Sequence, residues 1–243
     1  MARQSRHSPP LPVLITRPEP QANRFAAELT AMLGDSIRPV LSPLMAPAFL
    51  SPSLPDADAL VLTSETAVQA LAGLRGPLPK RAFCVGGRTA EAARSAGLEA
   101  ISAEGDATAL AALILSGPMD GPLLWLRGED TAGDLAGTLA RRGIRLDQAV
   151  VYRQDPQPLS PEAQALLQGQ GPVIVPLFSP RTARLFVASA QGAEAALYLC
   201  SLSAAVDRAA APLSARSRTI ATSPTGGALL ADVQGMVRAL LSA

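Results

Sequence analysis

Hydroxyl-bearing and basic side chains stand where apolar runs give way to helical patterns. Ser64 and Ser179 each follow such a run, and the next apolar runs end at Gly86 and Ser201. The spacing from Gly86 to Ser201 equals the spacing from Ser64 to Ser179. A serine at this kind of junction caps the helix, and the N–H groups of the first helical turn attract anions. The repeated pattern therefore predicts two similar sites for carboxylates or phosphates.

Six junctions of this kind supply the candidate binding residues. They are Arg17, Ser64, Thr66, Gly86, Arg88, Thr89, Arg127, Gly128, Ser179, Arg181, Ser201 and Ser203. Arg17 and Arg127 end matching apolar runs and are suited to clamping a carboxylate. Taken singly, each serine or threonine is explained as readily by an ordinary helix cap, each arginine by a surface position, and Glu129, Asp130 and Asp134 by solvated carboxylates near a helix start. The recurrence in both halves favours binding.

Tyr152 is the candidate for proton transfer. It is one of 2 tyrosines and follows Val150 and Val151, where a proline-containing segment begins. A phenol can donate a proton there, although a packed tyrosine explains the position equally well. The only histidine is His7, so the sequence offers no Ser-His or Cys-His couple and no histidine metal site. We expect a site without a histidine-bound metal.

Strand-like and helical patterns alternate along the chain. Residues 13–16 read as a strand, residues 19–33 as a helix that Gly34 ends, and Ser223 as the cap of a C-terminal helix. Continuous apolar strands between amphipathic helices predict an α/β fold with parallel sheets covered on both faces. In such sheets, ligands bind at the carboxyl ends of the strands, which is where the candidate residues fall.

Two proline-rich segments, 38–55 and 150–161, interrupt this alternation. Proline stiffens extended chain and disfavours central strands, so these segments suit crossings between domains. The sequence predicts a discontinuous domain 1 (residues 1–37 and 157–243), a domain 2 (52–149) and linker strands (38–51 and 150–156). Two similar halves are then expected to face each other across a cleft.

Composition excludes several classes of partner. The 243 residues carry a formal net charge of +1 and no dense run of lysine or arginine, which argues against nucleic acid. No stretch approaches the length of a membrane helix, and the first dozen residues read as a disordered tail without a signal sequence. Cys84 and Cys200 fall in predicted buried strands, which favours a reducing, cytoplasmic compartment.

A set of short motifs resembles the uroporphyrinogen-III synthase family. These motifs occur in the family's order and spacing from Val13 onward: Val13 to Pro18, Leu62-Thr63-Ser64, Val85 to Ala90, Leu126-Arg127-Gly128, Val150-Val151-Tyr152 and Phe178-Ser179-Pro180. The resemblance implies two flavodoxin-like domains joined by a two-stranded linker. It also implies a cofactor-free, monomeric, cytoplasmic enzyme of tetrapyrrole synthesis that contacts the preceding deaminase at most transiently.

The resemblance implies a substrate and roles for individual residues. The family cyclises hydroxymethylbilane, a linear tetrapyrrole polycarboxylate, with loss of water and inversion of the last ring. Tyr152 matches the family's linker tyrosine and would assist departure of the hydroxyl, and Ser64, Thr89 and Ser179 match positions that hold carboxylates. The chain departs from the family in the segment 201–205, where a threonine is replaced by alanine, and at Pro176, which suggests an edge strand or a bulge.

Other classes stay open at this point. A cytoplasmic two-domain anion-binding or sensor protein without catalysis would show the same helix starts, and so would an inactive or retuned relative of the enzyme. A methyltransferase or nucleotide-binding enzyme on a doubly wound sheet is a further alternative, although Gly86-Gly87-Arg88-Thr89 is neither a Walker loop nor a dinucleotide fingerprint.

Overall fold

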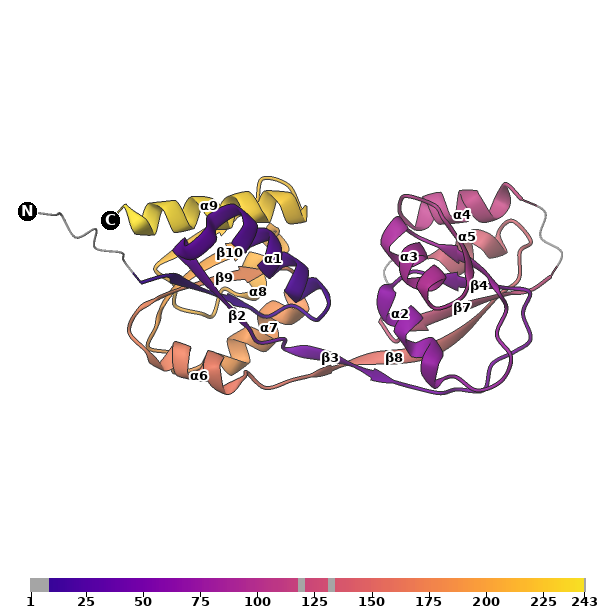
Figure 1. Ribbon diagram of the computed structural model, residues 1–243, viewed down its shortest axis with the longest axis horizontal. Coiled ribbons are helices and arrows are strands. Elements are labelled where there is room, and N and C mark those ends of the chain that lie inside the picture. Colours follow the sequence, from indigo (N-terminus) through magenta and orange to yellow (C-terminus); the bar gives the residue numbers. More distant parts are fainter. Residues whose placement is uncertain (1–8, 118–120, 131–133, 243) are drawn as a thin grey trace, which may run out of the picture. The chain divides into compact units, whose positions relative to one another are not determined.

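The computed structural model describes residues 9–117, 121–130 and 134–242. His7 and most of the expected N-terminal tail lie outside the described residues, whereas Leu11 and Pro12 already belong to the first strand. The chain divides into a first unit, Met1–Ala46 with Pro156–Ala243, and a second unit, Pro47–Asp155. Each unit is an α/β layer structure built on its own sheet, so the predicted fold class is confirmed (Figure 1). We propose that the two units are the two domains expected from the sequence.

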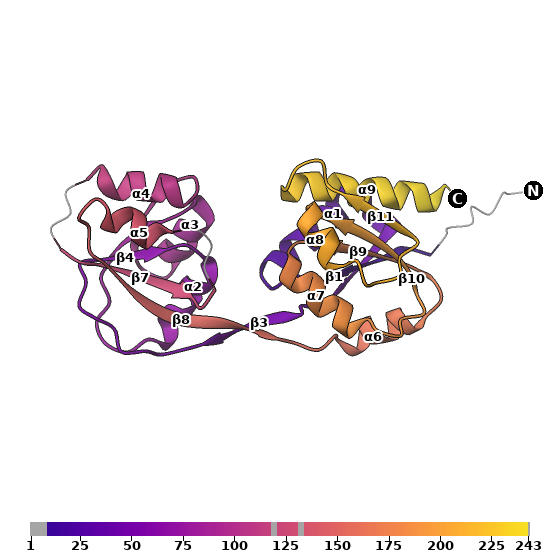
Figure 2. The same ribbon diagram turned by 180° about the vertical axis from the view of Figure 1, so that it is seen from behind.

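The first unit contains a five-stranded sheet in the order β11-β10-β9-β1-β2, with parallel neighbours. Helices α1 and α9 cover one face, and α6, α7 and α8 cover the other (Figures 1 and 2). The strands are β1 (Leu11–Ile15), β2 (Ile37–Leu41), β9 (Pro172–Leu177), β10 (Ala196–Ser201) and β11 (Ser217–Ile220). The helices are α1 (Gln21–Leu33), α6 (Pro161–Gln168), α7 (Pro180–Ser189), α8 (Ala204–Ala209) and α9 (Gly226–Leu241), with a 3-10 turn η1 (Gly34–Ser36).

The second unit contains a six-stranded sheet in the order β3-β8-β7-β4-β5-β6. Helices α2 and α3 cover one face and α4 and α5 the other. The strands are β3 (Met45–Phe49), β4 (Ala59–Leu62), β5 (Arg81–Cys84), β6 (Glu99–Ser102), β7 (Leu123–Gly128) and β8 (Leu146–Pro156). The helices are α2 (Glu65–Ala70), α3 (Gly87–Ser95), α4 (Ala107–Leu115) and α5 (Leu135–Ala140), with a 3-10 turn η2 (Leu71–Gly73).

Strands buried on both faces explain the continuous apolar runs. In β4, Leu60 and Leu62 belong to the core beneath α2 and α3, while Val61 belongs to the core beneath α4 and α5. Successive side chains of a strand point to opposite faces, so a run without polar residues is required when helices cover both. The parallel pairings then bring the carboxyl ends of β4, β5 and β7 to one edge of the sheet.

Two local expectations were wrong. Pro176 is in β9, which has neighbours on both sides, so it is not at an edge. The Leu177 carbonyl accepts the Leu202 N–H on the β10 side, which leaves the missing N–H of Pro176 on the β1 side. The cap of α9 is Thr225, whose hydroxyl accepts the Ala228 N–H, and not Ser223, because the helix begins two residues later than expected.

The segment expected to be the first linker contributes to the first unit. Residues 38–41 form most of β2 and pair with β1. β3 and β8 are neighbours in the six-stranded sheet, and the boundaries between the units fall within these two strands. The predicted end of α1 is confirmed, since Gly34 has a φ of 53° and its N–H donates to the Thr30 carbonyl.

Replacement of Gly235 by alanine should stabilise the protein. Gly235 is an exposed interior residue of α9, and a Cβ there would meet nothing within 4 Å. Alanine is favoured over glycine by about 1 kcal/mol in a helix interior. We expect Gly235→Ala to raise the free energy of unfolding by about this amount in urea denaturation, and an unchanged or lower value would contradict the packing of α9.

The two cysteines should make stability fall in alkali. Burial raises the pKa of Cys84 and of Cys200 from 9.0 to about 11. Because the folded pKa lies above the unfolded one, this contribution is fully present below pH 9 and is lost as the pH rises through 11. We expect the free energy of unfolding to fall between pH 9 and pH 11, and to fall less in the variant Cys84→Ala/Cys200→Ala. Equal pH slopes in the two proteins would contradict this burial.

Candidate functional site

A pocket of about 270 Å³ lies at the carboxyl edge of the second unit's sheet. It gathers residues from the ends of four neighbouring strands and from the helix starts beside them. Its lining residues are Thr63, Ser64, Val85, Ala107, Trp125, Gly128, Asp130, Leu135 and Tyr152. The predicted residues Ser64, Gly128 and Tyr152 are thus brought together within one unit.

The phenol of Tyr152 forms the polar centre of this pocket. Its oxygen lies 3.1 Å from Ser64 Oγ, and Ser64 Oγ also accepts the Ala67 N–H at 3.1 Å as the cap of α2. The Tyr152 side chain is half-buried, so it contacts the protein on one side and remains accessible on the other. A phenol held in this way can donate a proton to a bound molecule.

Trp125 forms an apolar wall of the same pocket and was not predicted from the sequence. Its indole N–H donates to Thr63 Oγ1 at 3.2 Å, and the residue is only 4% exposed. Val85 and Leu135 also line the pocket. An aromatic residue within an apolar strand is usually part of the core, so its type did not indicate a pocket. The one sequence feature that could have indicated a polar partner for Trp125 was Thr63 in the Leu62-Thr63-Ser64 motif.

Arg127 is engaged within the second unit. Its Nε donates to Gln148 Oε1 at 2.8 Å, and its Nη1 donates to the carbonyls of Gly128 (2.9 Å) and Glu129 (3.1 Å). The first of these bonds ties β7 to the neighbouring strand β8, and the other two hold the end of β7. The structure therefore gives Arg127 a role in holding the pocket wall, and its binding role stays a prediction.

The predicted residues around α3 lie beside the pocket. Gly86 is the cap of α3, Thr89 is buried in its first turn, and Arg88 is exposed. Thr66 is likewise buried in the first turn of α2. Glu104, whose φ of 50° is unusual for a residue with a side chain, places its carboxylate close to the start of α3: a Cβ at Gly87 would be 3.1 Å from Glu104 Oε1.

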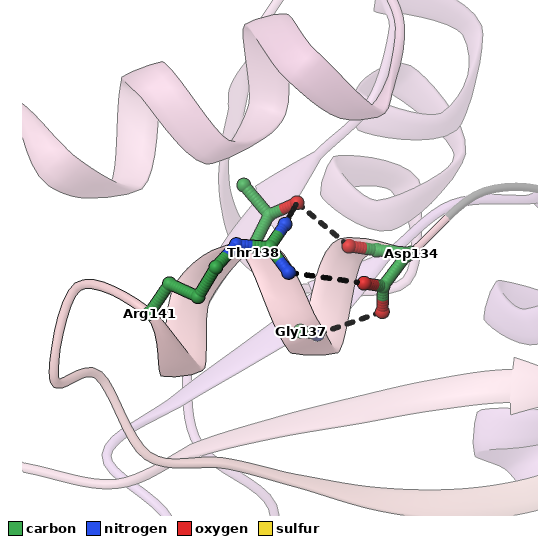
Figure 3. Close-up of polar contacts among 4 residues, drawn as sticks. All are labelled: Asp134, Gly137, Thr138 and Arg141. Carbon is green, nitrogen blue, oxygen red and sulfur yellow. Dashed lines mark hydrogen bonds and ion pairs between the residues drawn. The ribbon is translucent and has the colours of Figure 1, made fainter.

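Asp134 is an exposed carboxylate at a helix start, as expected, and the structure adds that it caps α5 (Figure 3). Its Oδ1 accepts the Gly137 N–H at 2.9 Å, and its backbone carbonyl accepts the Thr138 hydroxyl at 2.7 Å. Arg141 donates to Thr138 Oγ1 at 3.2 Å and forms an exposed ion pair with Asp134. Because Leu135 is the next residue, this cap fixes one wall of the pocket.

The first unit places its predicted residues at the ends of β1 and β9. Ser179 caps α7: its Oγ accepts the Thr182 N–H at 3.1 Å and lies 2.9 Å from Thr182 Oγ1. The guanidinium carbon of Arg17 lies 3.9 Å from the centroid of the Phe178 ring, so the predicted arginine is stacked on an aromatic face. Arg181 is half-buried in the first turn of α7.

Ser201 and Ser203 have different environments. Ser201 is fully buried, and its Oγ donates to Asp207 Oδ1 at 3.5 Å. Asp207 also pairs with Arg218, so this hydroxyl belongs to a network inside the first unit. The residue equivalent to the Gly86 cap is Ser203, two positions beyond Ser201, which caps α8 without a side-chain bond. The sequence alignment of the two halves was therefore wrong by two residues here.

Among residues 9–117, 121–130 and 134–242, no group of three or more His, Cys, Asp or Glu side chains is placed to hold a metal ion. Within the same residues, no helix is long and apolar enough to cross a membrane.

These features define a class of protein: two flavodoxin-like α/β units with polar residues at the carboxyl edges of parallel sheets. A sequence profile described as Uroporphyrinogen-III synthase HemD matches residues 26–231. Since this stretch is most of the chain, the protein belongs to the uroporphyrinogen-III synthase family.

A solved structure agrees with this fold. The uroporphyrinogen-III synthetase from Helicobacter pylori 26695 is 16% identical, covers 93% of this chain and 99% of its own, and superposes with a TM-score of 0.61. A mutant uroporphyrinogen III synthase from the extremely thermophilic bacterium Thermus thermophilus is 20% identical, covers 96% and 100% of the two chains, and has a TM-score of 0.46. Comparison with curated protein sequences finds no significant match.

Loss of the Thr63 hydroxyl should be detectable at Trp125. In Thr63→Val the buried indole N–H loses its acceptor while the side-chain volume is retained. An unsatisfied buried donor costs about 1–3 kcal/mol, so we expect lower stability by that amount. Trp125 is the only tryptophan in the sequence, so the fluorescence emission of the protein should shift with the substitution. Unchanged stability and emission would contradict this hydrogen bond.

Proposed function

We propose that this protein is an active uroporphyrinogen-III synthase, acting as a cytoplasmic monomer without a cofactor. It converts hydroxymethylbilane into uroporphyrinogen III, with loss of water and inversion of the last ring. Membership of the family supports this reaction. The observation that carries the proposal beyond membership is the Tyr152 phenol, which lies in a pocket and is hydrogen-bonded to Ser64.

The proposed reaction needs one general acid, placed beside the hydroxyl that leaves. The terminal C–O bond of hydroxymethylbilane breaks as the pyrrole nitrogen pushes its electron pair toward the departing hydroxyl, and a proton on that oxygen lets it leave as water. Tyr152 supplies this proton. The far ring then attacks the resulting azafulvene through its substituted carbon, and the spiro intermediate rearranges with the last ring inverted. The proton that the rearranged ring finally loses returns to the phenolate, which restores Tyr152.

Each unit contains residues suited to carboxylate recognition. The substrate bears an acetate and a propionate on each of its four rings, and arginine guanidinium groups match carboxylates geometrically. Arg88 is exposed in the first turn of α3, and Arg17 and Arg181 lie beside the start of α7. The starts of these two helices add backbone N–H groups and positive dipole ends. We assign carboxylate binding within each unit to these residues and to Thr66, Gly86, Thr89, Ser179 and Ser203.

Positioning supplies most of the catalysis in this proposal. A pyrrole expels a hydroxyl readily, and the uncatalysed ring closure gives the isomer without inversion. An enzyme that holds both reacting ends in the productive geometry gains the advantage of an intramolecular reaction. The product isomer therefore reports whether the protein directs the closure.

The test uses hydroxymethylbilane generated in the assay from porphobilinogen by a deaminase. The product is oxidised and the uroporphyrin isomers are separated. We expect isomer III to predominate with this protein. Isomer I at the level found without protein would favour the alternative, an anion-binding protein without catalysis.

Tyr152→Phe should lower kcat by about 10- to 100-fold, toward the low end of general acid catalysis because the hydroxyl leaves readily. KM should change little, since the carboxylate contacts remain. The matched control is Tyr198→Phe, which removes the hydroxyl of the other tyrosine, in β10 of the first unit, and should leave kcat unchanged. An unaltered kcat in Tyr152→Phe would remove this residue from the mechanism.

A further inference from the structure

We infer that Ser64 and Gly128 are positioning residues, which together set the place and direction of the Tyr152 phenol. This inference rests on the proposed function, because it assumes that Tyr152 donates the proton. It differs from the substrate-binding roles predicted for both residues. Three features of the second unit carry it: an irregularity in β8, the lack of a side chain at position 128, and the hydrogen bonds of Ser64.

The irregularity in β8 turns Tyr152 toward the pocket. Arg127 of β7 pairs with Val150, but the next residue, Gly128, pairs with Tyr152, so Val151 and Tyr152 oppose a single residue. This is the geometry of a β-bulge, which commonly re-aims a side chain. Val151 is fully buried in the core beneath α2 and α3, and Tyr152 packs against the same core. In a regular strand the two would face opposite sides.

Gly128 leaves the space that the Tyr152 ring occupies. β7 lies between β8 and β4, so the ring must pass the end of β7 to reach Ser64. A Cβ at position 128 would lie 2.6 Å from Tyr152 Cζ and 2.8 Å from both Cε2 and the phenol oxygen. Such distances are well inside van der Waals contact. Glycine is therefore required by the close approach of the ring, because any side chain would displace the tyrosine.

Ser64 fixes the direction of the phenol proton. A serine hydroxyl has one proton to donate and two acceptor positions. One acceptor position of Ser64 is used by the Ala67 N–H, at 3.1 Å. When Ser64 donates its own proton to the Tyr152 oxygen, 3.1 Å away, the phenol proton is directed elsewhere, into the pocket. The same bond remains after proton transfer and stabilises the phenolate.

Ser160, another serine that caps a helix, makes it possible to separate the positioning role of Ser64 from its role as a cap. Ser160 caps α6 by accepting the Ala163 N–H at 3.2 Å, in much the same way as Ser64 caps α2. Ser160 belongs to the first unit and is not one of the residues that line the Tyr152 pocket. Ser160→Ala therefore reproduces the loss of a cap without touching the phenol, and it serves as the matched control.

The first experiment is a double-mutant cycle of Ser64→Ala and Tyr152→Phe, read in kcat and KM. Alone, Ser64→Ala should lower kcat about 10-fold with little change in KM. In the Tyr152→Phe background it should lower kcat less than 2-fold, because residues that act through one another are not additive. Ser64→Thr, which retains the hydroxyl, should restore most of the activity, and Ser160→Ala should leave kcat unchanged.

The second experiment tests Gly128, and its main readout, stability in urea, does not depend on activity. Gly128→Ala should destabilise the protein in urea denaturation and should lower kcat at least as much as Tyr152→Phe. In a Tyr152→Ala background, where the ring is absent, Gly128→Ala should cause no further loss of stability. Gly235→Ala, at a site with no neighbour within 4 Å, controls for the effect of the substitution itself.

The outcomes distinguish the two proposals. Multiplicative losses of kcat in the Ser64 cycle, or a loss confined to KM, would mean that Ser64 contacts substrate directly and would overturn its positioning role. Additive stability losses in the Gly128 cycle would overturn the role of Gly128 even in an inactive protein. Isomer III from the wild type with an unaltered kcat in Tyr152→Phe would leave the proposed function standing and overturn this inference.

Discussion

The pairing of β7 with β4 on one side and with β8 on the other is the constraint on which the candidate site depends. This register places Ser64, Gly128 and Tyr152 in a row, although they are distant in sequence. The cores on both faces of the sheet hold the register, because a shift by one residue would move every buried side chain to the opposite face. The chemistry at the edge is therefore determined by packing within the sheet.

Most of the fold could be predicted because it follows from local rules. Apolar runs became strands, Gly34 ended α1, and Ser64 and Ser179 became caps, since each outcome depends on a few neighbouring residues. The position of Pro176 was predicted wrongly because a proline fits an interior strand when its missing N–H faces a side that does not need it. Which side that is depends on the arrangement of the sheet, not on the local sequence. The two-residue error at Ser201 arose because the stretch from the Ser179 cap to the Ser203 cap is two residues longer than the stretch from the Ser64 cap to the Gly86 cap.

The candidate site was predicted in its residue types but not in its contacts. Ser64 and Tyr152 could be predicted as site residues from their places after apolar runs. Their hydrogen bond could not, because it depends on an irregularity in β8 that no sequence pattern indicates. Trp125 escaped notice because an aromatic residue in a strand is usually core. The two halves also differ more than the repeat suggested: Ser64 faces the phenol of Tyr152, while Ser179 faces the hydroxyl of Thr182.

Because Gly128 contacts the Tyr152 ring, the substitutions that evolution can accept at one of these positions depend on the residue at the other. A descendant that keeps the tyrosine must keep the glycine, because every other residue brings a Cβ into the ring. A descendant that first loses the tyrosine is released from this requirement, and a side chain acquired at position 128 then obstructs its return. The order of substitutions therefore matters, and a residue other than glycine at this position would mark a lineage that no longer uses the phenol.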